Sequence, residues 1–96
     1  MNTPSILTVI LNYRTPDMTL LAAEAALLAQ EGLNAEVVIV DNDSGDGSFE
    51  VLKSAVQARH WPVRVLQSGR NGGFGAGNNF GMRAGLSNGQ APDFYY

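Results

Sequence analysis

Three short segments rich in valine and isoleucine alternate along this chain with longer segments that carry helical signals. The apolar runs are "SILTVILNY" (5–13), "AEVVIV" (35–40) and "VRVLQ" (63–67). Such runs are typical of strands that are buried on both faces, as in a parallel sheet. A further run, "DFYY" (93–96), reads as the opening of a fourth strand. The pattern predicts an α/β fold: a Rossmann-like parallel sheet of about four strands with helices on both faces.

Helices are expected between the strands. The first should run over 16–30, the second should be capped by Asp46 or Ser48 and end near Arg59, and the third should end near Ser87. Apolar spacing predicts the inward-facing side chains of the first two helices. They are Leu20, Leu21, Ala25, Leu27 and Leu28 in the first, and Val51, Leu52, Ala55 and Val56 in the second.

Glycines recur every four residues along the third helix, and this spacing places Gly77, Gly81 and Gly85 on one helical face. Each glycine weakens a helix by about 1 kcal/mol relative to alanine. Close backbone approach would compensate for that loss. We therefore expect this face to press on the sheet or on a ligand.

Composition excludes several classes of function. The chain has 96 residues and a net charge of −3, and its six basic residues are scattered, which disfavours a nucleic-acid or anionic-membrane surface. Cysteine is absent, so no disulfide or thiolate site is possible. The first residues lack the basic region and the apolar length of a signal peptide, so a cytoplasmic location is expected.

The segment "VVIVDNDSGDGS" (37–48) runs from a buried strand directly into acidic residues. Ligands of parallel α/β sheets collect beyond the carboxyl ends of the strands, so Asp41 and Asp43 lie where such a fold binds its ligand. One interpretation is a nucleotide-sugar site in which Asp41 accepts the imide hydrogen of uracil or thymine. Tyr13, at the end of the first strand, would stack on the same base. We therefore expect Asp41 and Tyr13 to share one pocket sized for a pyrimidine.

Other interpretations of the same segment differ in how well they fit. A calcium loop fails, because Asp46 stands where that loop needs glycine and Leu52 where it needs glutamate. A dinucleotide loop fails because Phe80 stands at its third glycine position, and no Gly-Lys-Ser/Thr phosphate loop is present. An aspartyl-phosphate phosphohydrolase using Asp41 and Asp43 stays open. So does a non-catalytic α/β interaction module with an exposed strand edge.

Three blocks in order carry a resemblance to a known family: "TVILNYR", "VVIVDNDSGDGS" and "NGGFGAGNNFG". Together they resemble the family 2 glycosyltransferases with a GT-A fold. The last block is similar to the branch typified by rhamnosyltransferases of bacterial cell-wall and surface-polysaccharide synthesis. Many other relatives carry Arg at the position of Asn78, so a base contact made by that Arg does not transfer to this chain.

The resemblance implies a sugar transferase that uses a nucleoside diphosphate donor of the UDP or dTDP type and a saccharide or lipid-linked acceptor, with rhamnose as one candidate sugar. The nucleotide-binding residues that it implies are Tyr13, Asp41, Asp43, Asn71, Gly73, Asn78 and Asn79. Family members hold Mg²⁺ or Mn²⁺ with an Asp-x-Asp motif at the end of the fourth strand, and an acidic residue further along the chain is their general base. Neither the Asp-x-Asp motif nor that acidic residue is found in this sequence. The "DND" of 41–43 comes one strand too early to be that metal motif.

Residues 1–96 are therefore expected to be the amino-terminal, nucleotide-binding portion of a longer enzyme, truncated at the carboxyl end. We expect no catalytic residue, no bound metal and no activity in this portion alone. Apolar surface left uncovered by the missing sheet predicts a homodimer. A full-length enzyme of this kind would work in the cytoplasm, at the inner face of the membrane.

Overall fold

The computed structural model describes residues 4–69 and 74–95. Four strands form one parallel sheet in the order β3-β2-β1-β4. The strands are β1 (Ile6–Asn12), β2 (Ala35–Asp41), β3 (Val63–Gln67) and β4 (Phe94–Tyr95), and the helices are α1 (Pro16–Ala29), α2 (Ser48–Ala58) and α3 (Phe74–Ala84).

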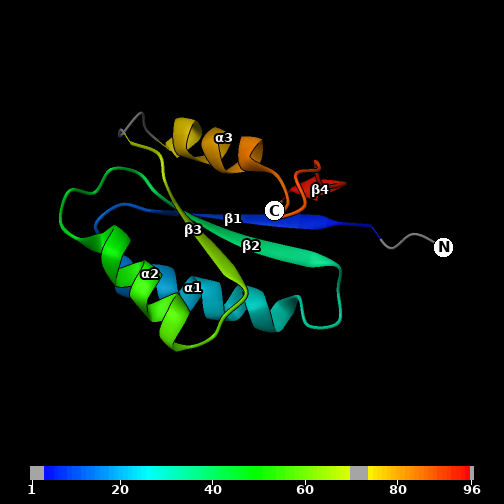
Figure 1. The fold of residues 1–96 in the computed structure, drawn as a ribbon, viewed down its shortest axis with the longest axis horizontal. Coiled ribbons are helices and arrows are strands. Elements are labelled where there is room, and N and C mark those ends of the chain that lie inside the picture. Colours follow the sequence, from blue (N-terminus) through cyan, green and yellow to red (C-terminus); the bar gives the residue numbers. More distant parts are fainter. Residues whose placement is uncertain (1–3, 70–73, 96) are drawn as a thin grey trace.

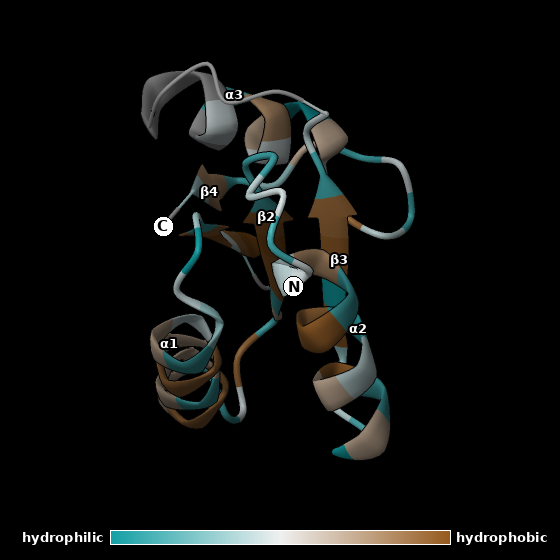
Figure 2. Ribbon diagram, turned by 90° about the vertical axis from the view of Figure 1, so that its left-hand side faces the viewer, coloured by the Kyte–Doolittle hydropathy of each residue, from teal (hydrophilic) through white to brown (hydrophobic). Residues whose placement is uncertain are grey.

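Helices cover both faces of the sheet, with α3 on one face and α1 and α2 on the other (Figure 1). Successive residues of a strand point to opposite faces, and β2 supplies both cores in this way. Val37 and Ile39 belong to the core under α1 and α2, whereas Val38 packs with Leu7 and Leu86 on the other face. The hydrophobic strands lie between the two helical layers (Figure 2). The predicted fold class is confirmed.

Glycine allows α3 to pack closely against the sheet, as the four-residue spacing predicts. A Cβ at Gly77 would lie 2.6 Å from Leu11 Cδ2, and a Cβ at Gly81 would lie 2.5 Å from Val9 Cγ1. Gly85 plays a different part, because α3 ends at Ala84 and not near Ser87. Its φ of +67° is a left-handed conformation that favours glycine, so Gly85 turns the chain away at the helix end.

The buried face of α1 differs from the predicted one. Thr19, Leu20 and Ala23 are buried, and Leu27 packs against the same core as predicted. Three of the predicted residues point outward: Leu21 and Leu28 are 68% and 67% exposed, and Ala25 is exposed too. The prediction failed because α1 carries apolar residues on every side, so its spacing alone does not single out the face that meets the sheet.

The second helix follows its prediction more closely. The N-cap of α2 is Gly47, which has no side chain to cap the helix, so the prediction that Asp46 or Ser48 is the N-cap is wrong. Asp46 instead closes the turn that leads into the helix, because its Oδ1 accepts a hydrogen bond from the backbone N–H of Ser48 at 3.0 Å. Leu52 and Val56 are buried as expected. Val51, however, is 50% exposed, because it lies one position off the face that contacts the sheet.

Candidate functional site

The carboxyl ends of three strands meet at one edge of the sheet. In the strand register, Asn12 of β1 lies beside Asp41 of β2, which lies beside Gln67 of β3. A row of three polar residues therefore crosses the sheet where the apolar runs end. Parallel α/β sheets bind ligands at such an edge.

Asp41 is the centre of this row and is only 1% exposed. Its Oδ1 accepts a hydrogen bond from Nδ2 of Asn12 at 2.8 Å and another from the hydroxyl of Ser44 at 2.6 Å. Its Oδ2 accepts a hydrogen bond from Nε2 of Gln67 at 2.9 Å and another from the backbone N–H of Ser44 at 3.3 Å. A carboxylate offers about four lone-pair sites, so the protein itself uses the accepting capacity of Asp41.

Ser44 ties this centre to the loop that follows β1. Its hydroxyl oxygen accepts the backbone N–H of Arg14 at 2.9 Å, and its carbonyl oxygen accepts Arg14 Nε at 3.0 Å. Thr19, in the first turns of α1, donates its hydroxyl to Asn12 Oδ1 at 2.7 Å. The loops after β1 and β2 and the start of α1 are thereby held together by one buried polar network, which we call the Asp41 network.

Hydrogen bonding keeps Asp41 ionised. Burial raises the pKa of Asp41, but the hydrogen bonds that it accepts from Ser44, Asn12 and Gln67 together outweigh burial, and the pKa lies below its ordinary value. The site therefore holds a buried negative charge, which its polar neighbours solvate in place of water.

Gln67 extends the Asp41 network to the loop after β3. While its Nε2 donates to Asp41, its Oε1 accepts the backbone N–H of Asp43 at 3.1 Å and that of Gly69 at 3.3 Å. Asn12, Ser44 and Gln67 were not among the predicted site residues. The signal in the sequence was a polar residue at the end of each apolar run, which only the strand register turns into one cluster.

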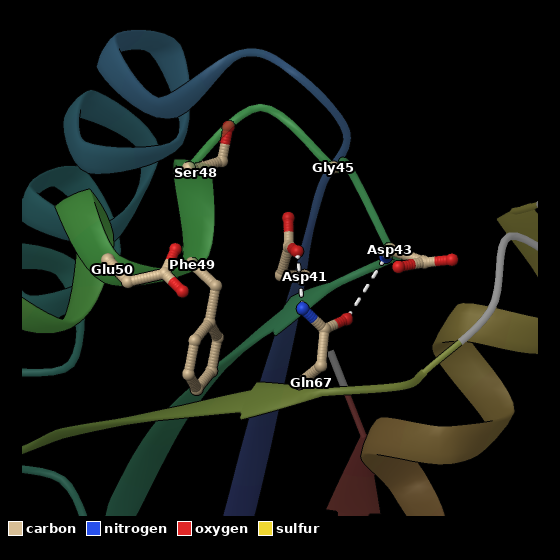
Figure 3. A pocket seen from close by; sticks show the side chains of 8 residues that line it. Asp41, Asp43, Gly45, Ser48, Phe49, Glu50 and Gln67 are labelled. Carbon is tan, nitrogen blue, oxygen red and sulfur yellow. Dashed lines mark hydrogen bonds between the residues drawn. The ribbon is translucent and has the colours of Figure 1, made fainter.

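A pocket of about 460 Å³ opens beside Asp41, between the β2–α2 loop and the end of β3. Its described lining is polar and acidic apart from one aromatic ring (Figure 3). The lining residues are Asp41, Asp43, Gly45, Gly47, Ser48, Phe49, Glu50 and Gln67. Asp43 is exposed and has a φ of 58°, a conformation that Asn and Asp tolerate better than most residues. Figure 3 shows its carboxylate directed away from Asp41.

The predicted site residues do not all meet. Asp41 and Asp43 line the pocket, whereas Tyr13 does not, as far as residues 4–69 and 74–95 show. The Arg14 guanidinium instead lies 5.1 Å from the centre of the Tyr13 ring. Tyr13 is thus not part of this pocket as far as its described lining goes, and its role in nucleotide binding stays a prediction.

The remaining predicted residues come from the segment after β3. Asn79 lines a separate hollow of about 340 Å³ with Met82, Arg83 and Tyr95. Asn78 lies within α3, and its side chain is outside the described part. The predictions for Asn71 and Gly73 also fall outside the described residues.

Neither a metal cluster nor a membrane span is found in the described part of the chain. No group of three or more His, Cys, Asp or Glu side chains there is arranged to hold a metal ion. None of the helices it contains combines the length and the hydropathy needed to cross a bilayer.

Comparison with known proteins gives the family. The model of the Glycosyl transferase family 2 matches residues 5–88, which include the whole Asp41 network and the lining of the pocket. The chain belongs to glycosyl transferase family 2. It is also similar to the succinoglycan biosynthesis protein ExoO of Rhizobium meliloti (strain 1021), with 36% identity over 81 residues. That match covers 84% of this chain and 22% of the relative, so the chain spans about a fifth of the length of the protein it resembles.

Proposed function

We propose that this family 2 domain forms the nucleoside-binding half of a glycosyltransferase that takes its sugar from a UDP or dTDP donor. The observation that carries the proposal is the pocket beside Asp41, at the carboxyl ends of β2 and β3, with residues 5–88 matching the family. A pocket of about 460 Å³ lies within the usual size range of small-molecule sites.

The chemistry of the lining favours the nucleoside over the diphosphate. Asp43 and Glu50 contribute carboxylates, and no Lys, Arg or His is among the described residues that line the pocket. Phosphate oxygens would be repelled there, because like charges at short range disfavour binding. The imide N–H of uracil or thymine and the ribose hydroxyls are donors, which suit carboxylate and backbone carbonyl acceptors.

Asp43 is the carboxylate that we assign to the nucleoside. Asp41 already accepts four hydrogen bonds inside the protein, so we assign it the role of positioning the surrounding loops. Asp43 is exposed on the pocket wall, and its backbone is held by Gln67. Phe49 replaces Tyr13 as the ring proposed to stack on the base, because Phe49 lines the pocket. Contacts from Asn71, Gly73, Asn78 and Asn79 remain part of the proposal.

The divalent metal that the family implies does not fit the described residues. They contain no group of three ligating side chains, and the pocket carboxylates project in different directions (Figure 3). We propose that Mg²⁺ or Mn²⁺ binds elsewhere in a longer protein, and we assign no metal-dependent step to this chain. The general base for the acceptor hydroxyl would come from that longer protein too, so residues 1–96 alone are proposed to be inactive in transfer.

The similarity to a succinoglycan biosynthesis protein supports a role in polysaccharide synthesis. We propose a saccharide or lipid-linked acceptor, with rhamnose as one candidate for the transferred sugar, and a reaction on the cytoplasmic side of the membrane. A phosphohydrolase is disfavoured by the structure. Its nucleophile must reach a phosphorus atom, whereas the Asp41 carboxylate is buried and fully hydrogen-bonded.

Comparing the affinities of uridine, UMP and UDP for the 96-residue chain without added metal tests this proposal. Uridine is expected to bind about as tightly as UDP, because the pocket recognises the base and the ribose. Thymidine and dTDP, compared in the same way, would show which pyrimidine is preferred. If UDP binds while uridine does not, the ligand is held by its phosphates and the proposed site is wrong.

A further inference from the structure

Helix α1 presents a second apolar face, on the side away from the sheet. Met18, Leu21, Ala25 and Leu28 form this face, which we call the exposed seam. Met18 is 70% exposed, Leu21 and Leu28 are exposed to a similar extent, and Ala25 is exposed as well. At about 100° per residue, the exposed seam lies nearly opposite the buried Thr19, Leu20 and Ala23.

The spacing of the exposed seam is that of a helix-pairing surface. Its residues follow one another by three, four and three positions, which is the a/d repeat of two heptads. Apolar residues of α1 therefore extend well beyond the side that the sheet buries, whereas a surface helix normally carries polar residues on its outer side. Figure 2 shows hydrophobic colour over most of the turns of α1, although only one of its sides meets the sheet.

Charge along the exposed seam is one-sided. Asp17 and Glu24 occupy the position just before each a position of α1, which is the g position of the heptad. Glu31 follows seven residues later, in the turn just beyond the end of the helix at Ala29. All three are exposed. Ala22 and Ala29, both exposed, occupy the e positions on the other flank. The exposed seam is thus bordered by negative charge on one side and by small residues on the other.

This charge pattern disfavours a second copy of the chain as the occupant. An antiparallel pair of α1 helices would bring g positions against g positions, and every one of them is acidic. A parallel pair would place each acid opposite an alanine, with no attraction to offset the repulsion between two chains of net charge −3. Complementarity instead requires Lys or Arg in the partner.

An apolar hollow adjoins the carboxyl-terminal end of the exposed seam. It has a volume of about 200 Å³ and is lined by Ile6, Ala26, Ala29, Gln30 and Leu33. Ala29 belongs both to this hollow and to the e flank, so the hollow continues the surface beside Leu28. It offers space for one large side chain of a bound helix.

We infer that α1 docks an amphipathic helix of a separate protein through the exposed seam, and that this helix carries apolar a/d residues and basic residues at the positions that face Asp17 and Glu24. The hollow beside Leu33 receives one apolar side chain at the end of that helix. This surface lies on the face of the sheet opposite α3 and has none of the pocket-lining residues, so the inference does not depend on the nucleotide site.

Synthetic helices test the docking of such a partner. One peptide of about three heptads carries Leu at a and d and Lys at e and g, and a matched peptide carries Glu at e and g. The Lys peptide is expected to bind the 96-residue chain at least about tenfold more tightly at low salt, with a difference that shrinks as salt is added. Equal affinities, or binding of neither peptide, would overturn the inference.

Charge reversal on the chain sharpens this test. Glu24→Lys is expected to lower the affinity of the chain for the Lys peptide and to raise its affinity for the Glu peptide, because the reversed charge lies beside the exposed seam. The double substitution Ser54→Lys with Gln57→Lys adds the same two units of charge on α2, at exposed positions, and is expected to leave the preference for the Lys peptide in place. If both variants change the preference alike, only net charge is sensed and the inference fails.

Other occupants give distinct results. A dimer in sedimentation that Leu21→Lys abolishes would assign the exposed seam to a second copy. Binding to anionic phospholipid vesicles that Leu21→Lys abolishes would assign it to a membrane. Because the chain has no cysteine, Leu21→Cys also gives a clean thiol probe. If that thiol is shielded in a longer form of the protein without added peptide, the exposed seam is part of the protein's own core. Each of these three results would overturn the inference.

Discussion

Asn12 and Asp41 face each other across β1 and β2, and the amide of Asn12 donates to the carboxylate of Asp41 at 2.8 Å. Both side chains are buried. The same carboxylate accepts hydrogen bonds from the side chains of Ser44 and Gln67, so one ionised group joins the ends of three strands. The Asp41 network thereby determines where the loop carrying Asp43 lies and so shapes the pocket.

Ser44→Ala should destabilise the fold although it removes a single oxygen. The hydroxyl donates to Asp41 and accepts the backbone N–H of Arg14, and both partners lose a hydrogen bond in a poorly hydrated place. We expect the free energy of unfolding to fall by about 1–3 kcal/mol in urea denaturation. Ser54→Ala, at an exposed position on α2, is the matched control and should change it by less than about 0.5 kcal/mol. Equal effects of both variants would contradict the central place of Ser44.

The stability of the chain at acid pH should depend on Asp41. Its pKa is lower in the folded chain than the ordinary value of 3.8, so the native state binds fewer protons than the unfolded state. Asp41 therefore stabilises the fold above that ordinary value, and its contribution is lost as pH falls through the folded pKa. Urea denaturation from about pH 5 to pH 2 should show a shallower loss of stability in Asp41→Asn than in the natural chain.

The pH experiment needs a variant that controls for substitution as such. Gln57→Ala changes an exposed, uncharged residue on α2 and should keep the acid slope of the natural chain. An Asp41→Asn slope as steep as that of Gln57→Ala would mean that Asp41 does not contribute to acid unfolding.

Gly81→Ala should be destabilising in spite of the better helix propensity of alanine. The added methyl would lie 2.5 Å from Val9 Cγ1 and 3.0 Å from Val40 Cγ2, and valine side chains in a sheet are stiff at χ1. We expect a loss of about 1–3 kcal/mol in the free energy of unfolding, as for other overpacked cores. Arg83→Ala, exposed on the same helix, should cost much less. A stabilised Gly81→Ala variant would show that α3 can shift off the sheet at little cost.

Much of the fold was predictable because the strands and the glycine face carry strong local signals. Continuous β-branched runs predicted β1, β2 and β3, and the glycine spacing predicted the close approach of Gly77 and Gly81. The orientation of α1 was not predictable from spacing, because Leu21 and Leu28 are as apolar as the buried Leu20. Which of these leucines is buried depends on how the helix lies on β1 and β2.

The candidate site was predictable in its location and less so in its contacts. Asp41 and Asp43 line the pocket as expected from a strand end that leads into an acidic loop. The sequence did not show that Asp41 would be satisfied inside the protein, because its partners Asn12 and Gln67 are brought beside it by strand pairing across 29 and 26 positions. The sequence also did not show that the aromatic ring beside Asp41 in the pocket lining would be Phe49 and not Tyr13.

The central claim is that a nucleoside binds against the exposed carboxylate of Asp43, in a pocket that the Asp41 network holds in shape. Calorimetric titration of uridine into Asp43→Asn and Asp46→Asn tests it most directly. Both variants remove one negative charge from the same loop, but Asp46 is not among the described residues that line the pocket. We predict that Asp43→Asn weakens uridine binding by about tenfold, because a hydrogen bond to a carboxylate is replaced by a weaker one to a neutral amide oxygen, and that Asp46→Asn binds like the natural chain. Equal affinities in the two variants would contradict the account.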